Sequence, residues 1–374
     1  MHAFRKPVSV LSPGELFGGV ETQILGLCTQ LRELGVKVQP LLFHDHELAA
    51  RLRDAGLEPR VIRARHRYDP AVARRLAELV DANGSRVLHV HGYRAAVTSA
   101  LAGSRLRVGV VRTEHGLPEP GTNFRDNVKS RLNHALDDWS TRRLGARVCY
   151  VTADIMRRFD RAHAGLTRRV IHNGIIPLTK AGRERPQGLA PDLFHVGIVG
   201  RVSQVKGIPF ALQALAHGSI PDRLRLDIIG TGPVLNDLRN AAEVLGLGDR
   251  VRFHGFQRDV IDWLAHLDVL LMPSLHEGLP YTLLEGMSLG VPVVASRIGG
   301  LAEVLRDGVT GLLVDVGDVA GLARALARLA AEPHLASRLA AAAAEEQRRG
   351  FTLARMVSDY VEAYAAADAA GHQE

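Results

Sequence analysis

The spacing of apolar residues changes repeatedly along this chain of 374 residues. Short runs of Val, Ile and Leu alternate with segments of helical periodicity, which is typical of βαβ units and of parallel sheets covered on both faces. In the first half the runs predict strands at 8–11, 36–43, 59–62, 87–90, 108–112, 148–151 and 169–172. In the second half they predict strands at 194–199, 224–229, 251–254, 269–272, 291–295 and 311–314.

A segment without periodicity separates the two series. Residues 173–192 are rich in Gly, Pro and charged side chains, a composition typical of a linker. The chain is also too long for one ordinary core, at roughly 100 to 200 residues for each domain. We therefore expect two doubly wound α/β domains, at 1–183 and 184–350.

Composition indicates the cellular setting. No run of about 18 uncharged apolar residues occurs, so a membrane-spanning helix is not expected. The first residues lack the apolar region and cleavage site of a secretion signal. The two cysteines, Cys28 and Cys149, lie outside any C-x-x-C spacing, which favours a reducing compartment. These features predict a soluble cytoplasmic protein with both cysteines buried.

Charge is divided unevenly between the two halves. Residues 1–186 hold 31 Lys and Arg against 18 Asp and Glu, whereas the remaining residues hold 16 against 22. Arginines crowd the segments 60–75 and 125–147. Such a face suits an anionic membrane surface or a lipid-diphosphate acceptor, or it is a solvated surface without a partner. Nucleic acid is not expected, because no aromatic residues interleave the arginines and no nucleic-acid-binding motif accompanies them.

The loops after predicted strands carry the candidate chemistry, since ligands of open α/β sheets lie beyond the carboxyl ends of strands. Gly18 and Gly19 open a helix where a phosphate can approach backbone amides, although a tight turn would use the same glycines. Gly200, Arg201 and Lys206 follow the first strand of the second series. Two positive charges there can offset the charge of a departing diphosphate. An ordinary polar loop is the alternative.

Two carboxylates follow the strand at 269–272. Pro280 suits the first turn of a helix, so we expect Glu277 in the loop before it and Glu285 about five residues inside it, roughly 7.5 Å along the axis. Glu277 can then accept hydrogen bonds from a sugar and Glu285 from a ribose, with phosphates between them. Either glutamate is alternatively a surface or capping residue, but an unpaired charge at Glu285 would be costly among its apolar neighbours.

Histidines follow two strands of the first half, His89 and His91 after one and His115 after the next. A His-x-His pair can ligate a metal, but no third ligand is evident, and no Asp-x-Asp triplet occurs. We therefore expect no metal and no cofactor, and a hydrogen bond from His115 to a sugar hydroxyl. The segment 230–235 begins like a dinucleotide fingerprint but lacks its third glycine.

Together these motifs resemble glycosyltransferase family 4, a large retaining family with the GT-B fold. The resemblance rests on the glycine pair, the Gly-Arg-x4-Lys-Gly loop and the Glu-x7-Glu segment, in order across nearly the whole chain. Further matching segments are 170–175, 228–233, 251–256 and 292–304. The resemblance implies two Rossmann-like domains facing a central cleft, with donor bound mainly by the second and acceptor by the first. It also implies a last helix, about 351–374, that returns to the N-terminal domain.

The resemblance further implies a role for each candidate residue. Gly19 meets the diphosphate from the first domain and His115 lies near the transferred sugar. Arg201 and Lys206 grip the diphosphate, Glu277 holds the donor sugar and Glu285 the ribose. The remaining donor-site residues by this analogy are Gly18, Gly200, Gly278, Leu279, Pro280, Tyr281 and Thr282, of which Tyr281 is bulkier than the Asn or Gly frequent there.

The sequence therefore predicts a metal-independent retaining glycosyltransferase of cell-surface polysaccharide or glycolipid synthesis. It would move a sugar from a UDP-, GDP- or ADP-linked donor, which is a substrate and not a cofactor, to a saccharide or lipid-linked acceptor. Peripheral contact with the inner membrane face stays open. The alternatives are a sugar-nucleotide epimerase of the same fold and a catalytically silent sugar-nucleotide-binding protein. The missing fingerprint argues against an NAD dehydrogenase.

Overall fold

The computed structural model describes residues 4–15, 17–63, 69–116 and 124–370, and within these ranges all side chains but those of residues 70 and 124–131. The chain divides into two compact units. Unit 1 comprises Met1–Gly174 and Leu353–Glu374, and unit 2 comprises Ile175–Thr352.

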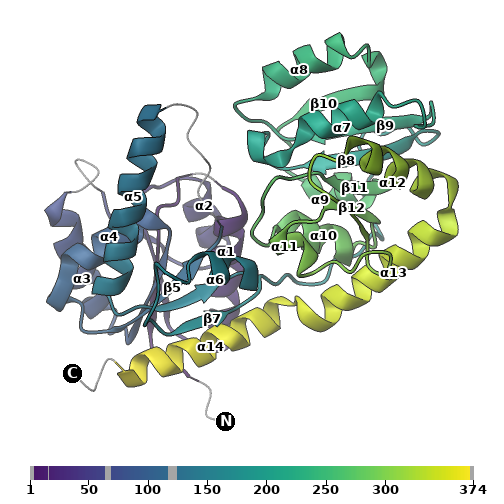
Figure 1. Ribbon diagram of the computed structural model, residues 1–374. Coiled ribbons are helices and arrows are strands. Elements are labelled where there is room, and N and C mark those ends of the chain that lie inside the picture. Colours follow the sequence, from purple (N-terminus) through teal and green to yellow (C-terminus); the bar gives the residue numbers. More distant parts are fainter. Residues whose placement is uncertain (1–3, 16, 64–68, 117–123, 371–374) are drawn as a thin grey trace. The chain divides into compact units, whose positions relative to one another are not determined.

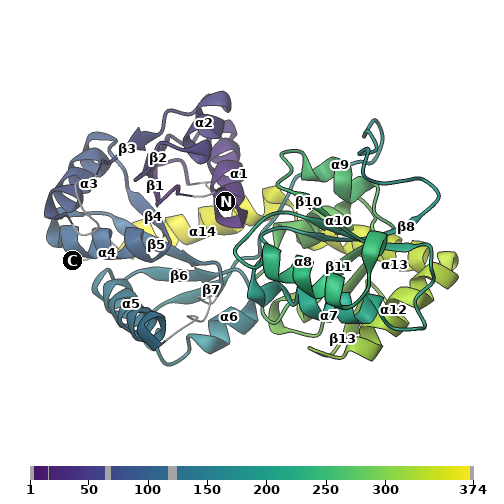
Figure 2. The same cartoon turned by 90° about the horizontal axis from the view of Figure 1, so that it is seen from above.

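Unit 1, on the left in Figure 1, is built on a seven-stranded sheet in the order β3-β2-β1-β4-β5-β6-β7, in which neighbouring strands run parallel; Figure 2 labels all of its strands. Its strands are β1 (Val8–Ser12), β2 (Val38–Leu42), β3 (Arg60–Val61), β4 (Val87–His91), β5 (Gly109–Glu114), β6 (Arg147–Tyr150) and β7 (Arg168–Val170). Its helices are α1 (Gly19–Glu33), α2 (Glu47–Asp54), α3 (Pro70–Ala82), α4 (Tyr93–Ala102), the 3-10 turn η1 (Gly103–Arg105), α5 (Phe124–Arg143), α6 (Ala153–Arg158) and α14 (Leu353–Ala370).

Helices cover both faces of the unit 1 sheet, because successive side chains of a strand point to opposite faces. Val8 and Val10 of β1 pack in a core with α1, α2 and α14. Leu11, on the alternate face of the same strand, packs in a second core with α3 and α4. The last helix, α14, lies against β5 and α1, and Figure 2 shows it running along the sheet. None of the described helices is long and apolar enough to cross a membrane.

Unit 2 has a six-stranded sheet of parallel neighbours in the order β10-β9-β8-β11-β12-β13. Its strands are β8 (Phe194–Val199), β9 (Leu224–Ile229), β10 (Val251–Gly255), β11 (Val269–Met272), β12 (Val293–Ser296) and β13 (Leu312–Val314). Its helices are η2 (Gln204–Lys206), α7 (Ile208–Leu215), α8 (Leu235–Val244), η3 (Gly248–Arg250), α9 (Val260–Ala265), α10 (Tyr281–Ser288), α11 (Gly299–Ala302), α12 (Val319–Ala331) and α13 (Pro333–Gly350).

All thirteen predicted strands are present, each within a few residues of its expected ends. One position differs in a way that matters for the site. His91 does not follow a strand but is the last residue of β4, since it still pairs with Thr113 of β5, and His89 lies within the same strand. The two buried cysteines are confirmed.

The segment expected to be a linker packs against unit 2. Leu189 is 2% exposed, and the Ala190 carbonyl accepts a 2.9 Å hydrogen bond from His195 Nε2. Arg252 donates to the Gly188 carbonyl over 3.0 Å. The units divide at residue 174, and the expected boundary at 183/184 lies inside the packed segment. A high content of Gly and Pro predicts irregular backbone, but it does not predict whether that backbone packs against a domain or connects two domains freely.

Candidate active site

The strand order of unit 2 reverses between β8 and β11. The chain winds outward in one direction through β9 and β10 and in the other through β12 and β13. In open α/β sheets such a switch point leaves a crevice beyond the carboxyl ends of the two central strands. Lys206 lies in the loop after β8 and Glu277 in the loop after β11, so the sheet topology itself brings them to this point.

The two side chains are in direct contact. Lys206 Nζ donates to Glu277 Oε1 over 2.7 Å, and the hydroxyl of Ser274 donates to the same oxygen over 2.8 Å. The Lys206 and Glu277 side chains are 18% and 13% exposed. Within the described residues Glu277 Oε2 carries no hydrogen bond. The pair is therefore partly buried, yet one carboxylate oxygen is left to accept from a ligand.

Two glycines hold these loops together. A Cβ at Gly207, which has φ +60°, would overlap the carbonyl oxygen of Pro273, so only glycine lets the β8 loop approach the β11 loop this closely. Leu275 N donates to the Val205 carbonyl over 2.8 Å across the same boundary. A Cβ at Gly300 would overlap the carbonyl oxygen of Gly278, which fixes the start of α11 against the Glu277 loop.

Glu285 is the fifth residue of α10, as the sequence predicts. The side chain is half-buried, and among the described residues it has no hydrogen bond or ion pair. Burial raises the pKa of Glu285 to about 7, from an ordinary value of 4.5. A carboxylate held without a partner is a costly arrangement, and it leaves strong acceptor oxygens for a ligand that brings hydroxyl groups.

The other residues predicted in unit 2 lie in the loops after β8 and β11 or at the start of α10. Gly200 and Arg201 follow β8 at exposed positions, whereas Gly278 and Thr282 are half-buried. Leu279 and Tyr281 are 3% and 8% exposed, so their side chains pack inside the unit. Pro280, expected in the first turn, is the N-cap residue of α10, and the helix begins at Tyr281.

The glycine pair of unit 1 caps a helix, as expected. Gly18 is the N-cap residue of α1 and Gly19 the first helical residue, and both are exposed. The Gly18 amide is already bonded, since it donates to Glu21 Oε2 over 3.1 Å. A carboxylate of the chain itself therefore occupies part of the anion-binding end of this helix, and an incoming phosphate would meet the next amides.

Histidines form a second polar group at the carboxyl edge of the unit 1 sheet. His115 follows β5, and its Nε2 lies 2.9 Å from Nδ1 of His91 at the end of β4. Burial lowers the pKa of His115 to about 3, and the positive charge of Arg112 adds to this effect. His115 is thus a neutral imidazole at physiological pH. No cluster of three or more metal-ligand side chains occurs in the part of the chain that the structure describes.

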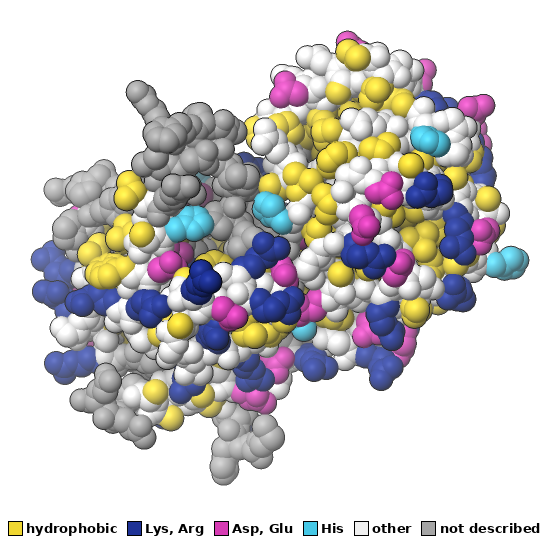
Figure 3. All heavy atoms as spheres, in the orientation of Figure 1, with side chains coloured by type: hydrophobic (Ala, Val, Ile, Leu, Met, Phe, Trp, Pro, Cys, Tyr) yellow, Lys and Arg dark blue, Asp and Glu magenta, His cyan; other side chains and the backbone are white. Residues whose placement is uncertain are grey.

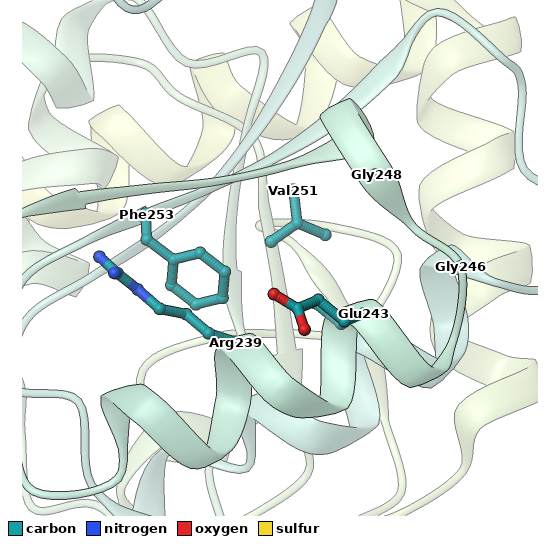
Figure 4. Close-up of a pocket in the computed structure, with 7 residues that line it drawn as sticks. Arg239, Glu243, Gly246, Gly248, Val251 and Phe253 are labelled. Carbon is teal, nitrogen blue, oxygen red and sulfur yellow. The ribbon is translucent and has the colours of Figure 1, made fainter.

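A hollow in unit 2 lies elsewhere. Figure 4 shows it between α8, η3 and β10, lined by residues that include Arg239, Glu243 and Phe253. The Arg239 guanidinium lies 5.6 Å from the centre of the Phe253 ring. Val251, at the amino end of β10, also lines it. The candidate loops instead follow the carboxyl ends of β8 and β11, so this hollow is not part of the predicted site.

Family models match both units. Residues 17–177 match the model described as Glycosyltransferase Family 4, and residues 194–332 match the model described as Glycosyl transferases group 1. The chain belongs to glycosyltransferase family 4. It is 39% identical over 142 residues to the lipopolysaccharide core biosynthesis glycosyltransferase LpsE of Rhizobium meliloti (strain 1021), over 38% of this chain and 41% of that one. With LpsD of the same organism it shares 32% identity over 188 residues, 50% of this chain and 53% of that one.

The alignments thus span about half or less of the length of these two curated relatives. Among solved structures, Anabaena Alr3699/HepE in complex with UDP and glucose matches with a TM-score of 0.83 at 21% identity, over 96% of this chain and 99% of that chain. At 21% identity this similarity is evidence for a common fold. The two parallel-sheet units are the two Rossmann-like domains of the predicted GT-B fold.

Sequence reasoning missed two features of this family 4 site. Ser274 was not singled out, although its place two residues after the end of β11 was a usable signal. Gly207 and Gly300 were part of matched motifs, but their partners across the loops are far apart in the sequence. Neither contact can be inferred without knowing which loops meet.

Proposed function

We propose that this protein is a retaining glycosyltransferase that moves a sugar from a nucleotide-diphospho-sugar to an acceptor, in cell-surface polysaccharide or glycolipid synthesis. One observation carries the proposal. In this family 4 chain, Lys206 Nζ and the Ser274 hydroxyl both donate to Glu277 Oε1, over 2.7 and 2.8 Å, at the switch point of the unit 2 sheet. The names of the two relatives from Rhizobium meliloti, both lipopolysaccharide core glycosyltransferases, support the biological setting.

Each side chain has a distinct proposed role in donor binding. Arg201 and Lys206 offset the charge that develops on the diphosphate as it leaves, so that the transfer needs no metal ion. Glu277 accepts from a hydroxyl of the donor sugar through its unbonded Oε2. Glu285 accepts from the hydroxyls of the ribose. The solved complexes of HepE with UDP and UDP-glucose support a UDP-linked donor as the first candidate.

The first expected outcome concerns donor binding and turnover. UDP-linked sugars should raise the melting temperature more than GDP- or ADP-linked sugars at equal concentration, because a ligand that binds only the folded protein stabilises it. With the selected donor, nucleotide release should depend on an added saccharide or lipid-linked acceptor and persist in EDTA. Proton NMR of the product should show the anomeric configuration of the donor.

Each alternative gives a different result in the same assay. Conversion of the donor sugar without an acceptor would indicate an epimerase. Donor binding with neither conversion nor transfer would indicate a silent sugar-nucleotide-binding protein. Loss of activity in EDTA that Mg²⁺ restores would contradict the metal-independent role of Arg201 and Lys206.

We further propose that unit 1 contacts an anionic lipid surface through helix α5. Leu132 and Trp139 lie seven residues apart, on one side of the helix, and are 67% and 43% exposed. The helix ends in Arg142 and Arg143, and the Arg143 guanidinium lies 5.9 Å from the Trp139 ring centre. Figure 3 shows Lys and Arg side chains recurring across the visible face of unit 1. Exposed apolar side chains beside basic ones are typical of interfacial helices.

The protein should therefore sediment with vesicles that contain phosphatidylglycerol and not with pure phosphatidylcholine vesicles. Replacing both Leu132 and Trp139 by serine should weaken this binding about 10-fold or more, because their apolar area no longer enters the lipid interface. Phe256→Ser is the matched control, since Phe256 is 69% exposed in unit 2. Binding that is equal for both vesicle types, or unchanged in the double variant, would rule out this surface.

A further inference from the structure

Three histidines lie in a row at the carboxyl edge of the unit 1 sheet. His89 and His91 are both fully buried in β4, with ring centres 4.1 Å apart. His91 in turn bonds His115, through Nδ1 and Nε2 respectively, over 2.9 Å. Of these three histidines only His115 is a predicted site residue, so the two buried rings have no role assigned so far.

His89 is fully satisfied by hydrogen bonds. Its Nδ1 lies 2.8 Å from the Tyr364 hydroxyl and its Nε2 lies 2.8 Å from Thr113 Oγ1. Thr113 is bonded to the Tyr360 hydroxyl over 2.9 Å. These contacts tie β4 and β5 to α14 and fix the plane of His89. Because the His91 ring packs against this ring, at a tilt of 45°, the orientation of His91 is restricted as well.

His91 differs, because one of its nitrogens has no partner. Its Nε2 is buried and carries no hydrogen bond in the described part of the chain. Ser12 Oγ, at the end of the adjacent strand β1, is also buried without a hydrogen bond. The register Leu11 to Val90 places Ser12 and His91 side by side where the strand order of unit 1 reverses, which is where ligands of such sheets bind.

The unbonded nitrogen decides how protons are shared between His91 and His115. Each neutral ring carries one N–H, and the hydrogen bond between the two rings needs one donor: either Nδ1–H of His91 or Nε2–H of His115. If it belonged to His115, His91 would carry its own proton on Nε2 and bury an N–H without an acceptor. Buried N–H groups without a partner are rarer than buried acceptors without one. The proton therefore belongs to Nδ1 of His91.

We propose that His91 is a positioning residue that holds His115 in the Nδ1–H tautomer and so directs a hydrogen-bond donor toward a sugar substrate. His115 Nε2 accepts from His91, which leaves its only ring proton on Nδ1. Nδ1 of His115 has no hydrogen bond within the described residues. It is also absent from the fully buried unbonded atoms there, so it is open to a ligand.

The arrangement gives His115 a defined chemical character. Burial lowers the pKa of His91 well below its usual range, and the pKa of His115 is about 3, so neither ring competes for a second proton. A neutral N–H donor suits a sugar hydroxyl or a ring oxygen. A free neutral imidazole prefers the Nε2–H form, so without His91 the ring would present an acceptor at the same place.

The test is the tautomer of His115, read by long-range proton–nitrogen correlation NMR on protein labelled with 15N-histidine. His115 is assigned from the spectrum of His115→Ala. The wild-type protein should show Nδ1 of His115 as the protonated nitrogen, and His91→Leu should convert it to the Nε2–H form. This readout requires neither donor nor acceptor. It therefore stands or falls separately from the proposed glycosyltransferase function, on which the catalytic consequence rests.

Two variants of equal polarity separate positioning from folding. His91→Asn places an amide donor near the position of Nδ1, whereas His91→Gln places it near Nε2. We expect His91→Gln and His91→Leu to lower kcat about 10- to 100-fold, the cost of one lost hydrogen bond in the transition state. His91→Asn should recover most of that loss and keep the Nδ1–H signature. A wild-type His115 in the Nε2–H form, or a tautomer unchanged in a folded His91→Leu protein, would overturn the proposal.

Discussion

Replacing Lys206 by methionine is expected to lower kcat for sugar transfer by about 10³-fold, at the upper end of the loss seen when one preorganised donor to a developing negative charge is removed. The Lys206 side chain is only 18% exposed, so solvent cannot fully replace its charge. Methionine keeps the length of the side chain and removes only the cation. Rates of nucleotide release at saturating donor and acceptor measure the effect.

The variant also leaves Glu277 with one partner, and this effect must be separated from the catalytic one. Without the ammonium, the Oε1 atom of Glu277 keeps only the Ser274 hydroxyl, and a partly buried carboxylate that loses its ion-pair partner destabilises a fold. The double variant Lys206→Met/Glu277→Gln removes the unpaired charge. Its melting temperature should return toward the wild-type value, whereas transfer should stay at or below the rate of the single variant.

Arg239→Met provides the matched control for Lys206. Arg239 is a cation of the same unit that packs beside Phe253 at the hollow in Figure 4. Its replacement should leave transfer within about two-fold of wild type, because no step of the proposed reaction uses it. A Lys206→Met protein with wild-type kcat, or a double variant that regains activity together with stability, would contradict a charge-offsetting role for Lys206.

The fold could be predicted almost completely from the sequence. Strands buried on both faces leave apolar runs that are visible without any structure, as at Val269–Met272, and helices between them force parallel neighbours. The carboxyl ends of those strands then predict where Lys206 and Glu277 lie. Topology alone thus accounts for the position of the donor-site candidates.

The contacts within the site could not be predicted in the same way. That Ser274 bonds the same oxygen as Lys206 depends on side-chain directions, which a strand boundary does not specify. The close approach of Gly300 to Gly278 joins loops that follow different strands. For His91, a one-residue error in the end of β4 changed a candidate loop ligand into a buried strand residue. Local pattern gives the elements, whereas these features arise only when distant elements meet.

Glu285→Gln should weaken donor binding about 10- to 100-fold and at the same time stabilise the protein. In the proposed role the Glu285 carboxylate accepts the ribose hydroxyls, and hydrogen bonds to a charged acceptor contribute about 1.5–3 kcal/mol each. Glutamine keeps one weaker acceptor. Wild-type affinity for the donor should fall as pH decreases below about 7, because the pKa of Glu285 is about 7 and the protonated carboxyl loses acceptor strength. The variant should bind weakly at every pH, as measured by calorimetry.

The stability that Glu285→Gln gains over the wild-type protein should increase with pH. Replacing a salt-bridged carboxylate would instead cost more stability as the pH rises. The pKa of Glu285 rises from 4.5 to about 7 on folding, so ionisation destabilises the folded state increasingly between these values and constantly above pH 7. Because the carboxylate is half-buried, we expect about 2 kcal/mol, or about 5 °C in melting temperature, at pH 8 and no gain at pH 4. Glu243 is an exposed glutamate that lines the hollow between α8 and β10, so Glu243→Gln should change neither donor affinity nor stability. If Glu285→Gln loses donor affinity without gaining stability at pH 8, the ionised carboxylate does not destabilise the folded protein before the donor binds.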